Sequence, residues 1–246
     1  MSKIAAAFQK HPKAFVPFIT SGDPNLATTQ KLIVAMAEAG ATVVELGIPF
    51  SDPVAEGEVI QRANIRALKE GCTTDKIFAM IKEVRKETDV PLVFLTYINP
   101  IFTYGTDKFY AKCAEVGVDG TIIPDIPFEE KGEVLDACKK YGVDLISLIA
   151  PTSKDRIQMI AREAMGYIYL VSSLGVTGVR REITTDIGAI VKEIRKVSAK
   201  PVAVGFGIAT PEQAAKMAAL SDGAIVGSAI VNYRAARQGR GGTGTP

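Results

Sequence analysis

The segment ELGIPFSDPVAEGE at residues 45–58 carries four acidic side chains, and the first of them stands where chemistry is expected. Glu45 directly follows the apolar run ATVV and is predicted to lie in a buried strand. A buried carboxylate is costly unless it has a partner, and burial moves its pKa toward neutrality, where it can donate and accept protons. Glu45 is therefore either a glutamate satisfied by a buried partner, for which the hydroxyl of Tyr169 is a candidate, or a catalytic group.

The three acids of the following loop have separate interpretations. Asp52 lies between Ser51 and Pro53, a composition typical of turns. Glu58 is expected in the first turn of the next helix, where negative charge interacts favourably with the helix dipole. Glu56 precedes Gly57 on a loop that can fold over a neighbouring cavity, so its position fits a solvated loop acid and a site residue equally well.

Other kinds of site are disfavoured by composition. His11 is the single histidine, which argues against a Ser-His-Asp triad and a histidine-rich metal site. The three cysteines, Cys72, Cys113 and Cys138, have no C-x-x-C spacing and do not indicate a disulfide framework or a zinc site. Composition therefore gives no case for a metal site.

Charge and hydropathy point to a soluble chain. The net charge is +2 over 246 residues, which gives no case for nucleic-acid or membrane binding. No apolar run reaches the roughly 18 residues that a membrane span needs, and residues 1–15 lack a signal peptide's apolar centre and predict a short amphipathic helix. A soluble, cytoplasmic protein is expected.

Short β-branched runs alternate with segments of helical period along the chain. Helices between strands require parallel pairing, and eight such units close into a (β/α)8 TIM barrel. An open doubly wound sheet is the alternative, but no G-x-G-x-x-G follows the first run. The predicted strands are 14–19, 42–48, 91–97, 119–125, 143–149, 167–172, 201–206 and 222–227.

The end of the chain does not fit a complete barrel. A closing helix of about 10–15 residues with an apolar face is expected after the eighth strand. Residues 232–238 offer one tyrosine and two alanines, and a glycine-rich stretch follows. We therefore predict a single barrel domain over 1–246, with an extra N-terminal helix, a shortened or missing final helix, and an irregular tail at 232–246.

Alternation along the second strand places Glu45 inside the barrel. Val44, Leu46 and Ile48 suit the face that packs on helices, so Val43 and Glu45 point inward. Glu45 is also near the carboxyl end of its strand, which is the end where barrel enzymes have their active sites.

Three glycine-bearing turns follow the last three strands: GVTG (175–178), GFG (205–207) and VGSA (226–229). Glycine lets backbone N–H groups approach an anion closely, and a helix that begins at Ser228 would direct its positive end at that anion. Each turn alone is typical of any tight connection. Together, at the end of the barrel where phosphate is commonly bound, they predict a phosphate site.

These residues carry a resemblance to a known family. The chain resembles the α subunit of tryptophan synthase over about residues 13–231, and the matching stretches occur in family order. They are PFITSGDP (17–24), VELGIPFSDPVAEG (44–57), YINPIFTYG (97–105), IPDIPFEE (123–130), YLVSSLGVTG (169–178), VAVGFGI (202–208) and GAIVGSAIV (223–231).

The resemblance implies a barrel that cleaves indole-3-glycerol phosphate to indole and glyceraldehyde 3-phosphate without a metal or an organic cofactor. It also implies a pyridoxal-phosphate β subunit as partner in an α2β2 assembly. Glu45 matches the catalytic glutamate, and Glu56 stands where most members carry the aspartate that binds the indole N–H. The resemblance further implies substrate contacts for Phe18, Leu95, Tyr169, Thr177, Gly178, Phe206, Gly207, Gly227 and Ser228, and a β-subunit contact for Asp52 and Pro53.

Two departures from the family pattern keep alternatives open. Glu56 is one methylene longer than aspartate, roughly an ångström of reach, and a misplacement of about that size can cost a hundredfold in rate. The final helix is shortened beside the turn at 226–229. A nearly inactive subunit that only activates its β partner therefore remains an alternative to the α-subunit lyase. A lyase that works without a β subunit is a second alternative, because it would use the same residues.

Overall fold

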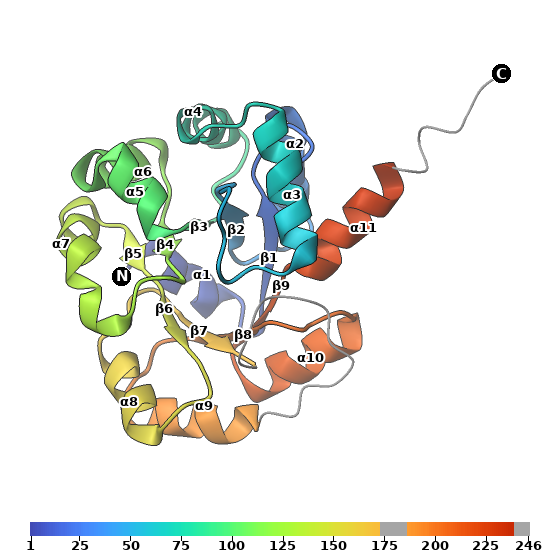
Figure 1. Ribbon diagram of the computed structural model, residues 1–246. Helices are drawn as coiled ribbons and strands as arrows, with labels where there is room; N and C mark the ends of the chain where they lie inside the picture. Colours follow the sequence, from blue (N-terminus) through green and yellow to red (C-terminus); the bar gives the residue numbers. More distant parts are fainter. Residues whose placement is uncertain (173–185, 239–246) are drawn as a thin grey trace.

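The chain folds as a (β/α)8 barrel (Figure 1). The structure is a computed structural model that describes residues 1–172 and 186–238, with side chains up to residue 235 at the carboxyl end. All strand pairs among these residues are parallel, in the order β5-β4-β3-β2-β1-β9-β8-β7-β6. The strands are β1 (Ala14–Thr20), β2 (Val44–Gly47), β3 (Leu92–Leu95), β4 (Gly120–Ile122), β5 (Asp144–Leu145), β6 (Ser147–Ile149), β7 (Ile168–Val171), β8 (Val202–Gly205) and β9 (Gly223–Val226).

Each of the eight predicted strands is confirmed, and the fifth is divided in two. β5 pairs with β4, and β6 pairs with β7. Between them the backbone N–H of Ile146 donates to the carbonyl of Thr121 over 2.9 Å. This single residue carries the chain from one neighbour to the other and closes the ring.

Helices surround the strands, and one lies across the ring (Figure 1). Ile4 and Phe8 of α1 are buried among the inward-facing residues of the strands, so the predicted N-terminal helix fills the amino-terminal end of the barrel. The helices are α1 (Lys3–Lys10), α2 (Leu26–Glu38), α3 (Glu58–Lys69), α4 (Thr74–Val84), α5 (Ile98–Tyr104), α6 (Thr106–Val116), α7 (Gly132–Tyr141), α8 (Lys154–Arg162), α9 (Ile187–Arg195), α10 (Pro211–Leu220) and α11 (Ser228–Gln238), with a 3-10 turn at Phe128–Glu130.

The predicted alternation of β2 is confirmed. Val44, Leu46 and Ile48 belong to the apolar layer between strands and helices. Val43 belongs to the interior layer, where Val93, Ile122 and Ile225 of other strands meet it. Glu45, which follows Val43 on the same face, is 1% exposed.

The end of the chain is more regular than predicted. Residues 228–238 form α11, so the prediction of an irregular tail from residue 232 is wrong for 232–238, and 239–246 lie outside the described residues. Val231 packs with Phe18 and two α3 residues. Arg234 forms an ion pair with the buried Asp23, which also pairs with Arg66 of α3. These long-range contacts hold a helix whose own apolar content is low.

Figure 1 shows α11 leading away from the ring of strands, on the side of α3. No helix in the described part of the chain is long and apolar enough to span a membrane.

Candidate active site

A cavity opens at the carboxyl ends of the strands, where the second-strand acid and the glycine turns were predicted to meet. Its space, including the open mouth, is about 480 Å³. Nine of the predicted residues line it: Phe18, Glu45, Glu56, Leu95, Tyr169, Phe206, Gly207, Gly227 and Ser228. Sequence reasoning missed three further lining residues, Ile60, Ile208 and Ile225.

Glu45 is a fully buried acidic residue in the wall of this cavity. The hydroxyl of Tyr167 donates a hydrogen bond to its Oε1 over 2.6 Å, and both side chains are buried. The prediction that Tyr169 is the hydroxyl partner is therefore wrong, although both tyrosines face inward on β7 or at its start. Burial raises the pKa of Glu45 from 4.5 to about 8, against the opposing effect of the Tyr167 hydrogen bond.

Tyr169 instead forms part of the cavity wall. Its ring meets the ring of Phe206 edge to face, with centroids 6.0 Å apart. It also lies against Gly205, where a Cβ atom would come within 2.4 Å of the Tyr169 hydroxyl oxygen. Glycine at 205 is thus required for the tyrosine to occupy this place.

Glu56 comes from the loop after β2 and is folded into the same cavity. It is 5% exposed, so the interpretation of Glu56 as a solvated loop acid is wrong. The side-chain amide of Asn64 donates to its Oε2 over 2.6 Å. Burial raises the pKa of Glu56 to about 7, and the Asn64 hydrogen bond opposes this rise.

The loop that carries Glu56 is fixed by contacts to its backbone. The side-chain amide of Gln61 donates to the Glu56 carbonyl over 2.6 Å, and the Ala55 N–H donates to the Tyr97 hydroxyl over 3.1 Å. Gln61 and Asn64 both belong to α3, which begins at Glu58 as predicted. The loop is therefore anchored to α3 and to the end of β3.

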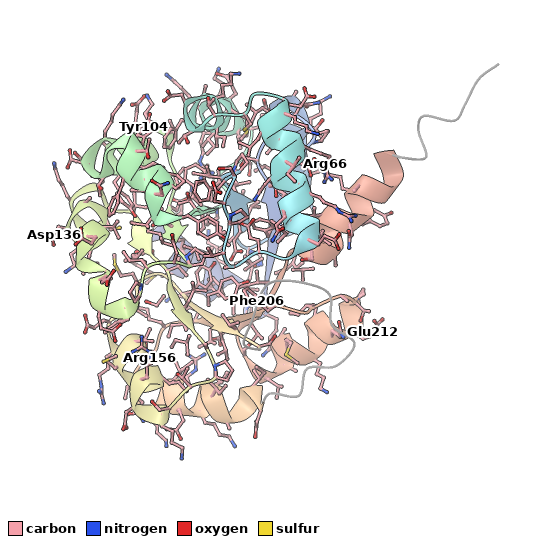
Figure 2. The ribbon with its side chains drawn as sticks, in the orientation of Figure 1. Arg66, Tyr104, Asp136, Arg156, Phe206 and Glu212 are labelled. Atoms are coloured by element: carbon pink, nitrogen blue, oxygen red, sulfur yellow. The ribbon has the colours of Figure 1, made fainter. Side chains whose placement is uncertain are left out.

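The glycine turn after β8 has an unusual backbone. Phe206 has a φ of 74° and Gly207 a φ of 75°, a region that non-glycine residues rarely adopt. The buried hydroxyl of Ser172, just after β7, donates to the Phe206 carbonyl over 2.6 Å and stabilises this turn. Figure 2 shows Phe206 near the centre of the ring, whereas the labelled Arg66, Tyr104, Asp136, Arg156 and Glu212 lie on the surrounding helices.

The turn after β9 leads directly into α11. Gly227 precedes Ser228, the first residue of the helix, and the helix's first N–H groups lie at the cavity. Because α11 is 11 residues long, its N-terminus carries a partial positive charge suited to an anion. The third predicted turn, at 175–178, lies outside the described residues, and with it Thr177 and Gly178.

The two interface candidates, Asp52 and Pro53, lie at the rim rather than in the cavity. Asp52 is exposed and accepts a hydrogen bond from the Ser51 hydroxyl, and Pro53 is half-buried. Beside them in sequence Val54 is 69% exposed, and Phe102 of α5, which follows the neighbouring strand β3, is 49% exposed. The rim therefore presents apolar side chains to solvent at the carboxyl ends of β2 and β3.

Fold and cavity together define a class: a (β/α)8-barrel enzyme with two buried carboxyl groups and glycine turns at the carboxyl ends of its strands. The family model of the tryptophan synthase alpha chain matches residues 4–240. The tryptophan synthase alpha chain of Lacticaseibacillus casei is 52% identical over 232 residues, which cover 94% of this chain and 87% of that relative. The chain belongs to the tryptophan synthase alpha chain family.

Solved structures agree with this assignment. The crystal structure of tryptophan synthase subunit alpha from Legionella pneumophila has a TM-score of 0.88 at 39% identity, covering 98% of this chain and 92% of that one. A chain from the tryptophan synthase α2β2 complex of Pyrococcus furiosus has a TM-score of 0.82 at 34% identity, covering 89% and 88%.

Proposed function

We propose that this protein cleaves indole-3-glycerol phosphate to indole and D-glyceraldehyde 3-phosphate, in the last steps of L-tryptophan biosynthesis, with Glu45 and Glu56 as its catalytic carboxyl groups. The observation that carries the proposal is the convergence of these two buried acids, from a strand and from a loop, in one largely apolar cavity. Membership of the tryptophan synthase alpha chain family supports the reaction.

The raised pKa values support different roles for the two acids. With a pKa of about 8, Glu45 holds a proton at neutral pH and can donate it to C3 of the indole ring. With a pKa of about 7, Glu56 is available as a carboxylate. Protonation of C3 places positive charge on the indole nitrogen, and the Glu56 carboxylate stabilises that charge through the N–H.

Bond cleavage then returns Glu45 to its starting state. The Glu45 carboxylate removes the proton from the hydroxyl on the carbon next to C3. The carbon–carbon bond breaks as the aldehyde forms, and its electron pair restores the aromatic ring as neutral indole. Glu45 is protonated again at the end, so one group performs both proton transfers.

The remaining cavity residues suit the two ends of this substrate. Phe18 and Leu95 offer apolar surface to the indole ring, and the backbone of Gly207, Gly227 and Ser228 offers donors to the phosphate. Binding energy at the phosphate end orients the reacting bond. The proposal also assigns substrate contacts to Thr177 and Gly178, which rest on the family resemblance alone.

The proposal includes a partner and a location. A tryptophan synthase β subunit is the partner, in an α2β2 assembly such as that of the Pyrococcus furiosus complex. Asp52 and Pro53, with the exposed Val54 and Phe102, offer it a contact at the cavity rim. A cytoplasmic location is supported by three buried cysteines without disulfides.

The test is the reaction itself. The isolated chain is given indole-3-glycerol phosphate, and indole and glyceraldehyde 3-phosphate are quantified, with and without added β subunit. Equal amounts of both products, lost in Glu45→Gln, are expected. A chain that releases no indole but raises β-subunit turnover would instead be a purely regulatory subunit. The burial of Glu56 inside the cavity favours the enzyme.

A further inference from the structure

An amide side chain occupies a place on α3 where an apolar residue is expected. Ile60, Ala63 and Ala67 form the buried face of this helix, and Asn64 lies among them at 2% exposure. A buried amide is unfavourable unless its hydrogen-bonding groups are used. Its Nδ2 donates to Glu56 Oε2 over 2.6 Å.

We propose that Asn64 is a positioning residue that fixes the orientation of the Glu56 carboxylate in the cavity. The inference rests on the proposed function, in which Glu56 accepts the indole N–H. Asn64 itself does not line the cavity, so it acts on the substrate through Glu56.

The contacts around Glu56 divide into two kinds. Gln61 and Tyr97 hold the backbone of the loop, through the Glu56 carbonyl and the Ala55 N–H. These contacts place the Cα atom but do not set the direction of the carboxyl group, which depends on the side-chain rotamer. The bond from Asn64 fixes the carboxyl group itself, through Oε2. In the proposed function the other oxygen, Oε1, accepts the indole N–H.

An amide is suited to this task because it does not ionise. It donates to the Glu56 carboxylate at any pH near neutrality and so favours the charged form that an N–H donor requires. The titratable groups around Glu56 do not offer a donor that is independent of pH. Glu45 and Tyr169 line the same cavity, Tyr97 bonds the loop backbone, and Glu58 is exposed and paired with Arg62.

The experiment compares two probes that differ at one atom. One is 3-(indol-3-yl)propyl phosphate, and the other is its benzothiophene analogue, in which sulfur replaces the N–H. Both are titrated calorimetrically into the wild-type protein and into Asn64→Leu, which keeps the size and branching of the side chain but has no donor. The ratio of the two dissociation constants measures recognition of the N–H alone.

The wild-type protein is expected to prefer the indole probe, and Asn64→Leu is expected to lose about tenfold of that preference, with benzothiophene binding little changed. Asn64→Gln, which keeps the amide, should restore part of it. The matched control is Thr121→Val, which removes the buried hydrogen bond to Tyr110 outside the cavity and should leave the ratio unchanged.

A merely structural role for Asn64 predicts a different result. It would weaken both probes alike, and an unchanged ratio in Asn64→Leu overturns the inference. If Asn64→Leu does not fold, Asn64→Ser, which is too short to reach Glu56, takes its place under the same criterion. Glu56→Met, which has a similar length but no oxygen acceptor, separates the two proposals. A wild-type preference that survives in Glu56→Met overturns the role of Glu56, and with it that of Asn64.

The pH profile gives a second readout. Loss of the donor disfavours the Glu56 carboxylate, so the acidic limb of kcat/KM should move to higher pH by about one unit in Asn64→Leu. If the acidic limb of kcat/KM in Asn64→Leu stays at the wild-type pH, the inference is contradicted, even where the activity is reduced.

Discussion

Replacing the deepest acid of the site should make the protein more stable while it removes activity. In Glu45→Gln the amide oxygen can still accept the Tyr167 hydroxyl, and the side chain has the same length. What disappears is a group whose charged form is disfavoured by burial. The variant therefore isolates the free energy that the fold loses by holding an ionisable group there.

The size of this gain in stability, and the pH range over which it occurs, follow from the raised pKa of Glu45. The pKa of Glu45 rises from 4.5 to about 8 on folding, so between these pH values the unfolded chain ionises and the folded protein does not. Stability of the wild-type protein is therefore retained below pH 4.5 and lost as pH rises toward 8. At about 1.4 kcal/mol per unit, the stability gap between variant and wild type should widen by about 2.5 kcal/mol from pH 5 to pH 7.

The assay is denaturant unfolding of both proteins at pH 5, 6, 7 and 8 and constant ionic strength. Contributions from the other titrating groups cancel in the difference between the two proteins. Glu58→Gln is the control, because that carboxylate is exposed on α3. The difference in unfolding free energy between this variant and the wild type should stay within about 0.5 kcal/mol at every pH. A Glu45→Gln gap that is constant over this range would refute the assignment of a raised pKa to Glu45.

Three further results are expected. The plot of kcat/KM against pH should be bell-shaped, with an acidic limb near 7 for ionisation of Glu56 and a basic limb near 8 for loss of the Glu45 proton; a profile flat from pH 6 to 9 would contradict these roles. Gly205→Ala places a methyl group 2.4 Å from the Tyr169 hydroxyl oxygen and should lower kcat/KM by about a hundredfold in the indole-release assay. Ser172→Ala removes the hydrogen bond to the Phe206 carbonyl, in the turn that belongs to the proposed phosphate site, so it should weaken binding of glycerol 3-phosphate about tenfold by calorimetry. Unchanged binding would argue against this role.

The barrel and the inward direction of Glu45 could be predicted because both depend on local pattern. Alternation along 43–48 assigns Val44 and Leu46 to the helices and Glu45 to the interior whatever the rest of the chain does. The order of strands and helices then requires parallel pairing. Neither step needs knowledge of a particular long-range contact.

The errors fall where a partner is distant in sequence. Tyr167 and Tyr169 have the same inward parity, so only the height of each ring along the barrel decides which one reaches Glu45. The helix at 232–238 includes Arg234, which pairs with Asp23, 211 residues away, and this contact is not visible in the local sequence. Asn64 did leave a sequence signal, as a polar residue at the apolar spacing of α3, and that signal identifies the side chain but not its partner.

The helix α1 closes the barrel at the end opposite to substrate entry, and Phe8 stacks on the ring of Tyr167 with centroids 5.3 Å apart. Tyr167 in turn bonds Glu45. The buried side chains of α1 thus shield Glu45, the proposed proton-transferring acid, from water at the amino-terminal end of the barrel. A substitution in α1 that lets water reach Tyr167 would therefore lower the pKa of Glu45 without altering any residue that lines the proposed substrate cavity.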